Sequence, residues 1–150
     1  MRYKKVMTTV DETNKFAHTL AKLVHKQDVI LLEGDLGAGK TTFAKAFAKG
    51  IGVKRVVSSP TFTIMKQYEG RLTFNHLDVY RLADSEEDLG WEEIFYGEAV
   101  TLVEWAHLIE EDLPVEYLKI DIRYVDMNTR EFILTAKGIR YEQMLRELKG

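Results

Sequence analysis

A glycine-rich segment, Gly34–Thr41 with the sequence GDLGAGKT, constrains the fold more than any other part of this chain. It matches the pattern G-x-x-x-x-G-K-[ST] and follows a continuous apolar run at residues 29–32. Such a run is typical of a central strand that is buried on both faces of a sheet. After the segment, apolar residues recur at helical spacing, which predicts a helix from about Lys40 to Gly50. The segment is therefore predicted to join a central strand to a helix.

A loop of this kind is built to bind phosphate. Glycines let consecutive backbone N–H groups point at phosphate oxygens, and the helix that follows adds the positive end of its dipole. We expect Lys40 to reach the β- and γ-phosphates, the Thr41 hydroxyl to ligate Mg²⁺, and Thr42 to contact the α-phosphate. The alternative is a glycine-rich turn with an ordinary solvated lysine. The predicted nucleotide-binding residues of the loop are Asp35, Leu36, Gly37, Ala38, Gly39, Lys40, Thr41 and Thr42.

The nucleotide is predicted to be ATP and not GTP. Proteins that read guanine with an Asn-Lys-x-Asp tetrapeptide need an aspartate three residues after the asparagine. The Asn-Lys pair of this chain, Asn14-Lys15, has Ala17 at that place.

The rest of the chain alternates between strand and helix patterns without a linker or a repeat, which predicts one domain over residues 1–150. Helices are expected near 11–25, at the C-terminus and, as short pieces, in the acidic stretch 84–96. Strands are expected near 3–7, 29–32, 64–68, 72–78, 100–103, 118–124 and 131–136. Two strand pairs look like antiparallel hairpins. The predicted fold is therefore a three-layer α/β/α sandwich of the P-loop NTPase type, with a mixed parallel and antiparallel sheet.

Composition excludes several classes of site. The chain has no cysteine, so thiolate metal sites are excluded and any metal is expected to be held by oxygen ligands. A net charge of -3 argues against a broad basic surface for nucleic acid, so a link to RNA is expected to be indirect. No apolar stretch approaches the roughly 20 residues that a membrane span needs. We therefore expect a cytoplasmic protein without membrane contact.

Two acidic residues compete for the metal site. Asp78 stands at the end of the predicted strand 72–78, and Glu104 follows the apolar run 100–103. The second strand is the more apolar of the two and is the better match to the strand that usually carries a metal-binding acid. The alternatives are a strand-end cap for Asp78 and a salt-bridged acid for Glu104.

Four motifs together resemble the TsaE (YjeE/YdiB) family: GDLGAGKTTFAKAFAKGIG from Gly34, SSPTF from Ser58, HLDVYRL from His76 and LVEWA from Leu102. The resemblance implies a small bacterial P-loop ATPase that acts in making threonylcarbamoyladenosine in tRNA. It implies TsaD and TsaB as protein partners, with tRNA contacted only through them. It also implies that Asp78 holds Mg²⁺. We then assign Glu104 to orienting the attacking water or to the outer shell of the metal.

Two further residues are predicted to respond to the nucleotide. Thr61 lies in the polar segment 58–62, which resembles a switch loop ordered by a γ-phosphate; the alternative is a simple turn built on Pro60. Trp105, next to Glu104, is expected near the nucleotide, although tryptophan is more often a core residue. Of the remaining polar residues, His76 is expected to be a hydrogen-bonded strand residue. Arg71, Arg123 and Arg130 are expected to be solvated strand arginines.

Three functions fit this pattern: a partner-dependent ATPase, a small-molecule kinase, and a nucleotide-gated docking module that hydrolyses little ATP. A kinase needs an acceptor pocket and usually an arginine-rich lid, and the sequence has no cluster of arginines. We therefore favour the ATPase, with Lys40 and Glu104 as its catalytic residues. The sequence does not separate an ATPase from a docking module.

Overall fold

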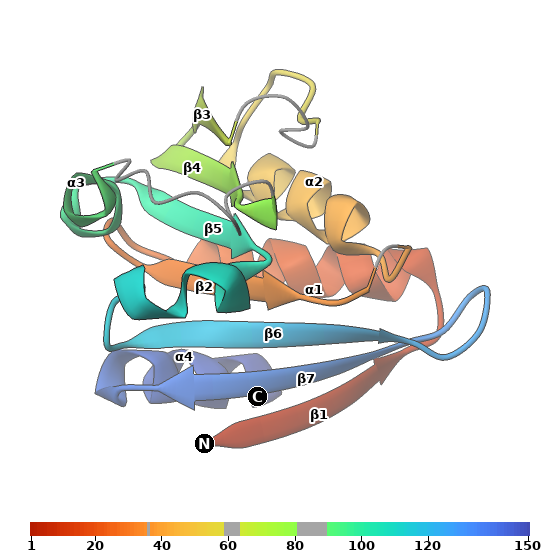
Figure 1. The fold of residues 1–150 in the computed structure, drawn as a ribbon. Helices are drawn as coiled ribbons and strands as arrows, with labels where there is room; N and C mark the ends of the chain where they lie inside the picture. Colours follow the sequence, from red (N-terminus) through yellow and green to blue (C-terminus); the bar gives the residue numbers. More distant parts are fainter. Residues whose placement is uncertain (36, 59–63, 81–89) are drawn as a thin grey trace.

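The computed structural model describes residues 1–35, 37–58, 64–80 and 90–150. The elements follow one another along the chain as in Figure 1: β1 (Arg2–Met7), α1 (Val10–Leu23), β2 (Val29–Glu33), α2 (Lys40–Ile51), β3 (Met65–Glu69), β4 (Thr73–Asp78), α3 (Trp91–Tyr96), β5 (Val100–Glu104), the 3-10 helix η2 (Ala106–Asp112), β6 (Tyr117–Tyr124), β7 (Arg130–Lys137) and α4 (Ile139–Lys149). The predicted strands and long helices are confirmed to within a few residues. The helix η2 was not predicted.

The strands form one seven-stranded sheet in the order β1-β7-β6-β2-β5-β4-β3. The central strands β6, β2, β5 and β4 are parallel to one another, whereas β1, β7 and β3 pair antiparallel at the two sides. All five residues of β2 and all five of β5 are buried, as expected for strands covered on both faces. The predicted mixed sheet is confirmed, and the carboxyl ends of β2, β5 and β4 meet at one edge.

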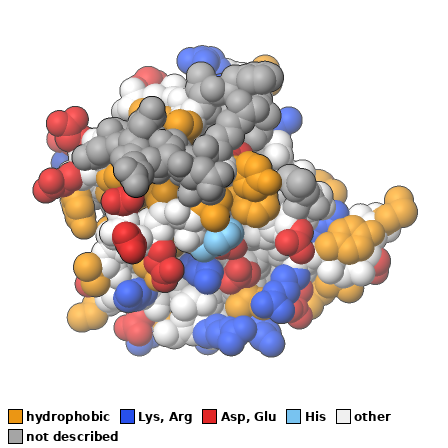
Figure 2. Space-filling view, viewed as in Figure 1, with side chains coloured by type: hydrophobic (Ala, Val, Ile, Leu, Met, Phe, Trp, Pro, Cys, Tyr) orange, Lys and Arg blue, Asp and Glu red, His pale blue; other side chains and the backbone are white. Residues whose placement is uncertain are grey.

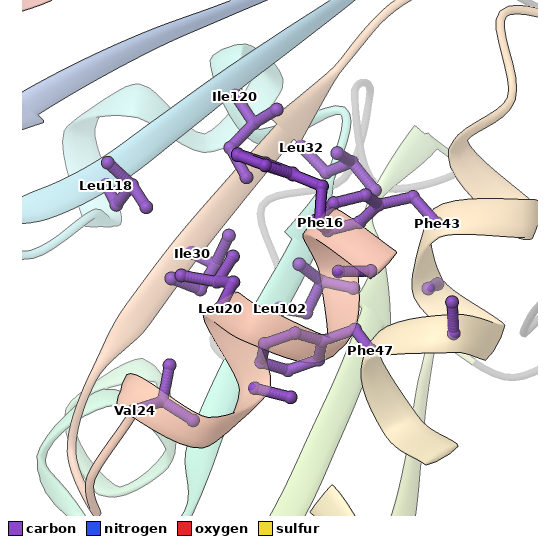
Figure 3. Close-up of a cluster of buried hydrophobic side chains, with 14 of the residues drawn as sticks. Phe16, Leu20, Val24, Ile30, Leu32, Phe43, Phe47, Leu102, Leu118 and Ile120 are labelled. Carbon is purple, nitrogen blue, oxygen red and sulfur yellow. The ribbon is translucent and has the colours of Figure 1, made fainter. Parts of the chain in front are cut away.

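Helices cover both faces of this sheet, which gives three layers. One face packs against α1, α2 and α4, and the other packs against α3 and η2 (Figure 1). The larger core lies under α1 and α2, where Phe16 and Leu20 of α1 meet Phe43 and Phe47 of α2 over Ile30 of β2 (Figure 3). This core fixes α2 against the sheet and thereby fixes the loop that begins it.

Helices α1 and α2 approach closely at Gly50, where a Cβ atom would lie only 2.6 Å from the Cβ of Ala21. Gly50 is thus a packing residue, and the prediction that it ends α2 was wrong by one residue. The helix continues to Ile51, and Gly52 caps it with a φ of 94°. Arg71 is exposed, as predicted, but its Nη2 also donates to the carbonyl oxygens of Ala21 and Val24 at the end of α1.

The surface of the sheet's β1 side is basic. The edge strand β1 carries three basic residues, Arg2, Lys4 and Lys5. Lysine and arginine side chains gather at the lower edge of the space-filling view (Figure 2). Charged side chains on an edge strand discourage pairing with another chain. No helix in the described ranges is long and apolar enough to cross a bilayer.

Candidate functional site

The glycine-rich loop connects β2 to α2 at the carboxyl edge of the sheet, as predicted; within it, Leu36 lies outside the described residues. Gly34 has a φ of 153°, and a Cβ atom there would lie 2.6 Å from the carbonyl oxygen of Ile122 on β6. Gly39 is the N-cap of α2 with a φ of 107°, a value that L-residues rarely adopt. Both glycines are therefore required by the path of the loop.

Arg130, at the start of β7, holds this loop in place. Its Nε donates to the carbonyl oxygen of Ala38 at 2.9 Å, and its Nη1 donates to the carbonyl oxygens of Asp126 and Thr129. Its guanidinium also lies 4.7 Å from the centre of the Tyr124 ring. The prediction of a solvated arginine was wrong, because Arg130 links the β6–β7 turn to the glycine-rich loop.

Lys40 is the first residue of α2, and its ammonium group is buried. Within the described residues Nζ has no hydrogen-bond partner; it lies 3.5 Å from the centre of the Trp105 ring. Burial lowers the pKa of Lys40 below its ordinary value, against the opposing charges of four carboxylates: Glu104, Asp78, Glu33 and Asp35. A buried cation without a hydrogen-bond acceptor is costly, so this position favours an anionic ligand.

Trp105 is half-buried and has a φ of 62°, which is unusual for a tryptophan. This backbone turn ends β5 and lets η2 begin at the next residue. Its ring lies under the Lys40 ammonium and 5.0 Å from the ring of Tyr80. Trp105 therefore lies beside the loop lysine and also packs against the core under α3 and η2. Its contact with a nucleotide stays a prediction.

The helix η2 is held against the end of β2 by a histidine and a carboxylate. The backbone N–H of His107 donates to Oε1 of Glu33 at 2.9 Å, and its ring Nδ1 lies 2.6 Å from Oε2 of the same side chain. Since Trp105 directly precedes η2, this contact also fixes the position of Trp105.

The two candidate acids lie side by side, because Asp78 of β4 and Glu104 of β5 are direct partners in the sheet register. Glu104 also pairs with Leu32 of β2, so the two acids lie next to the strand that leads into the loop. Glu104 is buried, and its Oε2 lies 2.6 Å from Nε2 of His76. The prediction of a hydrogen-bonded His76 is confirmed, and its partner is now identified.

Asp78 is more accessible than Glu104 and is partly exposed. Its Oδ1 accepts a hydrogen bond from the backbone N–H of Tyr80 at 3.0 Å. Burial raises the pKa of Asp78 above its ordinary value; the charge of Glu104 adds to this, while the Tyr80 N–H, Lys40 and His76 oppose it. A nearby cation would favour the ionised form of this carboxylate.

The hydroxyl-bearing residues Thr41 and Thr42 are exposed at the start of α2, as are Asp35 and Gly37 in the loop. A recess continues from Gly39 and Thr42 between α1 and the β6–β7 turn. The exposed loop surface therefore adjoins the recess at Gly39 and Thr42.

The described parts of the chain contain no group of three or more His, Cys, Asp or Glu side chains placed to hold a metal ion. The available donor set is instead the Thr41 hydroxyl and the carboxylates of Asp78 and Glu104. These hard oxygen donors fit Mg²⁺, which keeps several waters and is usually completed by phosphate oxygens. The residues present therefore fit a magnesium ion that arrives with a nucleotide.

Two contacts at the site were not predicted: the one between His76 and Glu104, and the one between Arg130 and Ala38. For the first, a signal was available in part. His76 precedes Asp78 by two residues on a strand, so period-two alternation could have placed both side chains on the face that carries the site. The bond from Arg130 to Ala38 joins residues 92 apart in sequence, and no local pattern signals it. Thr61, the predicted switch-loop residue, lies outside the described residues.

A family model described as "Threonylcarbamoyl adenosine biosynthesis protein TsaE" matches residues 7–132. The chain is 54% identical over 139 residues to the tRNA threonylcarbamoyladenosine biosynthesis protein TsaE of Bacillus subtilis, covering 92% of this chain and 88% of that protein. It is 38% identical over 128 residues to the protein of that name from Treponema pallidum, covering 84% of this chain and 95% of the other.

The fold is also similar to the crystal structure of Bacillus subtilis YdiB. The TM-score is 0.87 at 46% sequence identity, and the match covers 99% of this chain and 95% of that chain. The family model covers most of the chain, and the relatives are similar over nearly their whole length. This chain belongs to the TsaE family of tRNA threonylcarbamoyladenosine biosynthesis proteins.

Proposed function

We propose that this chain binds ATP with Mg²⁺ at the loop Gly34–Thr41 and hydrolyses it in support of tRNA threonylcarbamoyladenosine formation. The observation that carries the proposal is the buried Lys40 ammonium at the N-terminus of α2, which has no hydrogen-bond partner in the described residues. A triphosphate supplies the acceptors that this cation lacks, and the loop N–H groups and the helix dipole favour the same anion.

The residues around Lys40 would bind the metal ion, activate the attacking water and contact the nucleoside. Thr41 and Asp78 would hold Mg²⁺, which would neutralise negative charge on the phosphate oxygens when bound. Glu104 is suited to accept a proton from the attacking water or to orient it, because its carboxylate is buried beside Lys40 and Asp78. The nucleoside would extend past Thr42 into the recess near Arg130.

Full activity is proposed to need the partners TsaD and TsaB, with tRNA contacted only through them. Among the described residues, Arg130 near the loop already donates to three backbone carbonyls, so it is not available to a transferring phosphoryl group. A partner that adds positive charge or orders the loop around Thr61 would complete the site. We place this reaction in the cytoplasm. We propose that this chain hydrolyses ATP slowly when it is alone.

A single-turnover assay tests this function. Excess protein is mixed with radiolabelled ATP and Mg²⁺, with and without a purified TsaD–TsaB pair, and binding to the pair is measured with a non-hydrolysable ATP analogue, with ADP and without nucleotide. We expect slow hydrolysis alone, faster hydrolysis with the pair and tightest binding in the ATP-like state, as linkage requires. Binding without any hydrolysis would indicate the docking module. Equal affinities in all three states, with an unchanged rate, would exclude partner coupling.

A further inference from the structure

The side chains of His76 and Glu104 share one face of the sheet. On β4, Phe74 belongs to the core under α1 and α2, whereas Leu77 belongs to the core under α3 and η2. Alternation then places His76 on the face of Phe74. On β5, Leu102 belongs to the α2 side, so Glu104 two residues later does as well. The contact therefore lies on the face where α2 begins with Lys40.

The contact is short and fully enclosed. Nε2 of His76 lies 2.6 Å from Oε2 of Glu104, and the two side chains are only 1% and 4% exposed. Bonds in which one partner is ionised are shorter and stronger than neutral ones, and burial removes the competition of water. The Glu104 side chain thus has one carboxylate oxygen committed to the protein, and in the described residues Oε1 accepts no hydrogen bond.

The surroundings of His76 favour one tautomer of its ring. Nδ1 of His76 is buried and has no hydrogen-bond partner in the described part of the chain. A hydrogen on Nδ1 would therefore be a buried N–H without an acceptor among these residues. With the hydrogen on Nε2, that N–H donates to Oε2 of Glu104.

Core packing holds the imidazole ring in this orientation. The ring of His76 stacks on that of Phe74, with centroids 5.8 Å apart and an interplanar angle of 11°. Phe74 in turn packs edge-on against Phe47 of α2, at 5.6 Å. The orientation of the carboxylate is thereby tied to the same helix that positions Lys40.

We propose that His76 is a positioning residue for ATP hydrolysis: it binds Oε2 of Glu104 and leaves Oε1 as the oxygen that faces the attacking water. The inference rests on the proposed function. His76 does not touch the nucleotide and exchanges no proton in the reaction. Its contribution is to hold the Glu104 carboxylate in one rotamer, as groups that orient a general base do in other active sites.

The test is a double-mutant cycle of His76→Leu and Glu104→Gln, with single-turnover hydrolysis as the readout and MgATP affinity measured by calorimetry. We expect His76→Leu to slow hydrolysis by about ten- to a hundredfold, the range for residues that orient a ligand from outside. MgATP affinity should change less than about threefold. In the Glu104→Gln background, His76→Leu should add almost no further loss, because both changes remove one function.

Two variants separate positioning from folding. His76→Gln places an amide N–H near the position of Nε2 and should recover most of the lost rate. Thr101→Val is the matched control, since Thr101 is buried on β5 and pairs with Asn75, the neighbour of His76, in the register. Its hydroxyl has no hydrogen-bond partner among the described residues and lies outside the proposed machinery. This variant should leave hydrolysis unchanged. Thermal unfolding of all variants identifies any variant that fails to fold. If His76→Leu fails to fold, the cycle is run with His76→Asn instead, because the asparagine side chain is too short for its amide to reach Glu104, and His76→Gln serves as its comparison.

The outcomes are distinct. A wild-type rate in His76→Leu, or full additivity with Glu104→Gln, would overturn the positioning role while leaving ATP hydrolysis at this site intact. Loss of MgATP binding together with hydrolysis in a folded His76 variant would also overturn it. If the wild-type chain hydrolyses no ATP under single-turnover conditions, the proposed function fails, and this inference fails with it.

Discussion

The two ends of the central strand β2 bury charged groups in opposite ways. At the amino end, buried Asp28 accepts hydrogen bonds from the backbone N–H of His25 and from Arg140, at 2.8 Å each, and the Tyr141 hydroxyl accepts the backbone N–H of Val29. At the carboxyl end, the buried Lys40 ammonium has no hydrogen-bond partner among the described residues. The buried charge at the amino end is thus paired within the protein, whereas the buried charge at the carboxyl end lacks such a partner among the described residues.

This difference separates structural polar groups from functional ones. A satisfied buried network stabilises a fold because each group regains in the protein what it loses in water. A buried charge without a partner destabilises the fold. Such a group is expected at a site where a bound ligand supplies the missing partner. The Thr101 hydroxyl at the amino end also has no partner in the part of the chain that the structure describes, but that group is neutral and leaving it unpaired costs less. The comparison predicts that changes at the carboxyl end alter activity and changes at the amino end alter stability.

The largest expected effect is on hydrolysis at the carboxyl end. Glu104→Gln should lower the single-turnover rate by about two to four powers of ten, the span for a positioned general base. MgATP affinity and thermal stability should stay near wild type, because the amide keeps the shape of the side chain. The measurement is single-turnover hydrolysis with calorimetry on the same sample. An unchanged rate would remove Glu104 from the mechanism.

At the amino end, Arg140→Met should lower the free energy of unfolding by about 2 kcal/mol, because Asp28 would lose its cationic partner while staying buried. The effect is below that of a fully buried pair, since the Arg140 side chain is 32% exposed. Urea denaturation measures it. MgATP affinity and hydrolysis should be unchanged at temperatures where the variant is folded; a loss of either would contradict the division between the two ends.

Asp78→Asn should raise the Mg²⁺ concentration needed for half-maximal nucleotide binding by about tenfold, the lower end for loss of a metal-orienting group. A neutral amide is a weaker ligand for a hard cation than a carboxylate. A Mg²⁺ titration at fixed ATP measures the shift. Binding in the absence of Mg²⁺ serves as the control and should not weaken. An unchanged titration would assign the metal to Glu104 instead.

The smallest expected effect is at Tyr141. Tyr141→Phe should lower the free energy of unfolding by about 1 kcal/mol, because the Val29 N–H loses its hydrogen-bond acceptor. Burial raises the pKa of Tyr141 to about 12 from its ordinary value of 10.0. The unfolded chain therefore ionises this tyrosine first, and wild-type stability should fall as pH rises from 10 toward 12. Tyr141→Phe should lack that part of the fall. Parallel pH profiles of the two proteins would contradict the assignment.

Sequence patterns predicted the strands, loop and helix that form this site, but not the hydrogen bonds that connect its side chains. The strand β2, the loop and α2 were predictable because the motif and the helical periodicity are local, and Asp78 and Glu104 were predictable because each ends a strand pattern. The pairing of His76 with Glu104 depends on the register between β4 and β5, and the bond from Arg130 to Ala38 depends on where the β6–β7 turn lies in space. Neither is encoded in any short window.

The central claim is that Lys40 is kept buried and unpaired for a phosphate, and one pair of measurements on Lys40→Met tests it most directly. MgATP affinity by calorimetry should fall by at least about a hundredfold, the size expected for losing a buried, charge-assisted contact. In the absence of nucleotide, the free energy of unfolding should rise by about 1 kcal/mol, because an unpaired buried cation is replaced by an apolar side chain of similar length. Wild-type MgATP affinity, or a less stable nucleotide-free protein, would contradict the account.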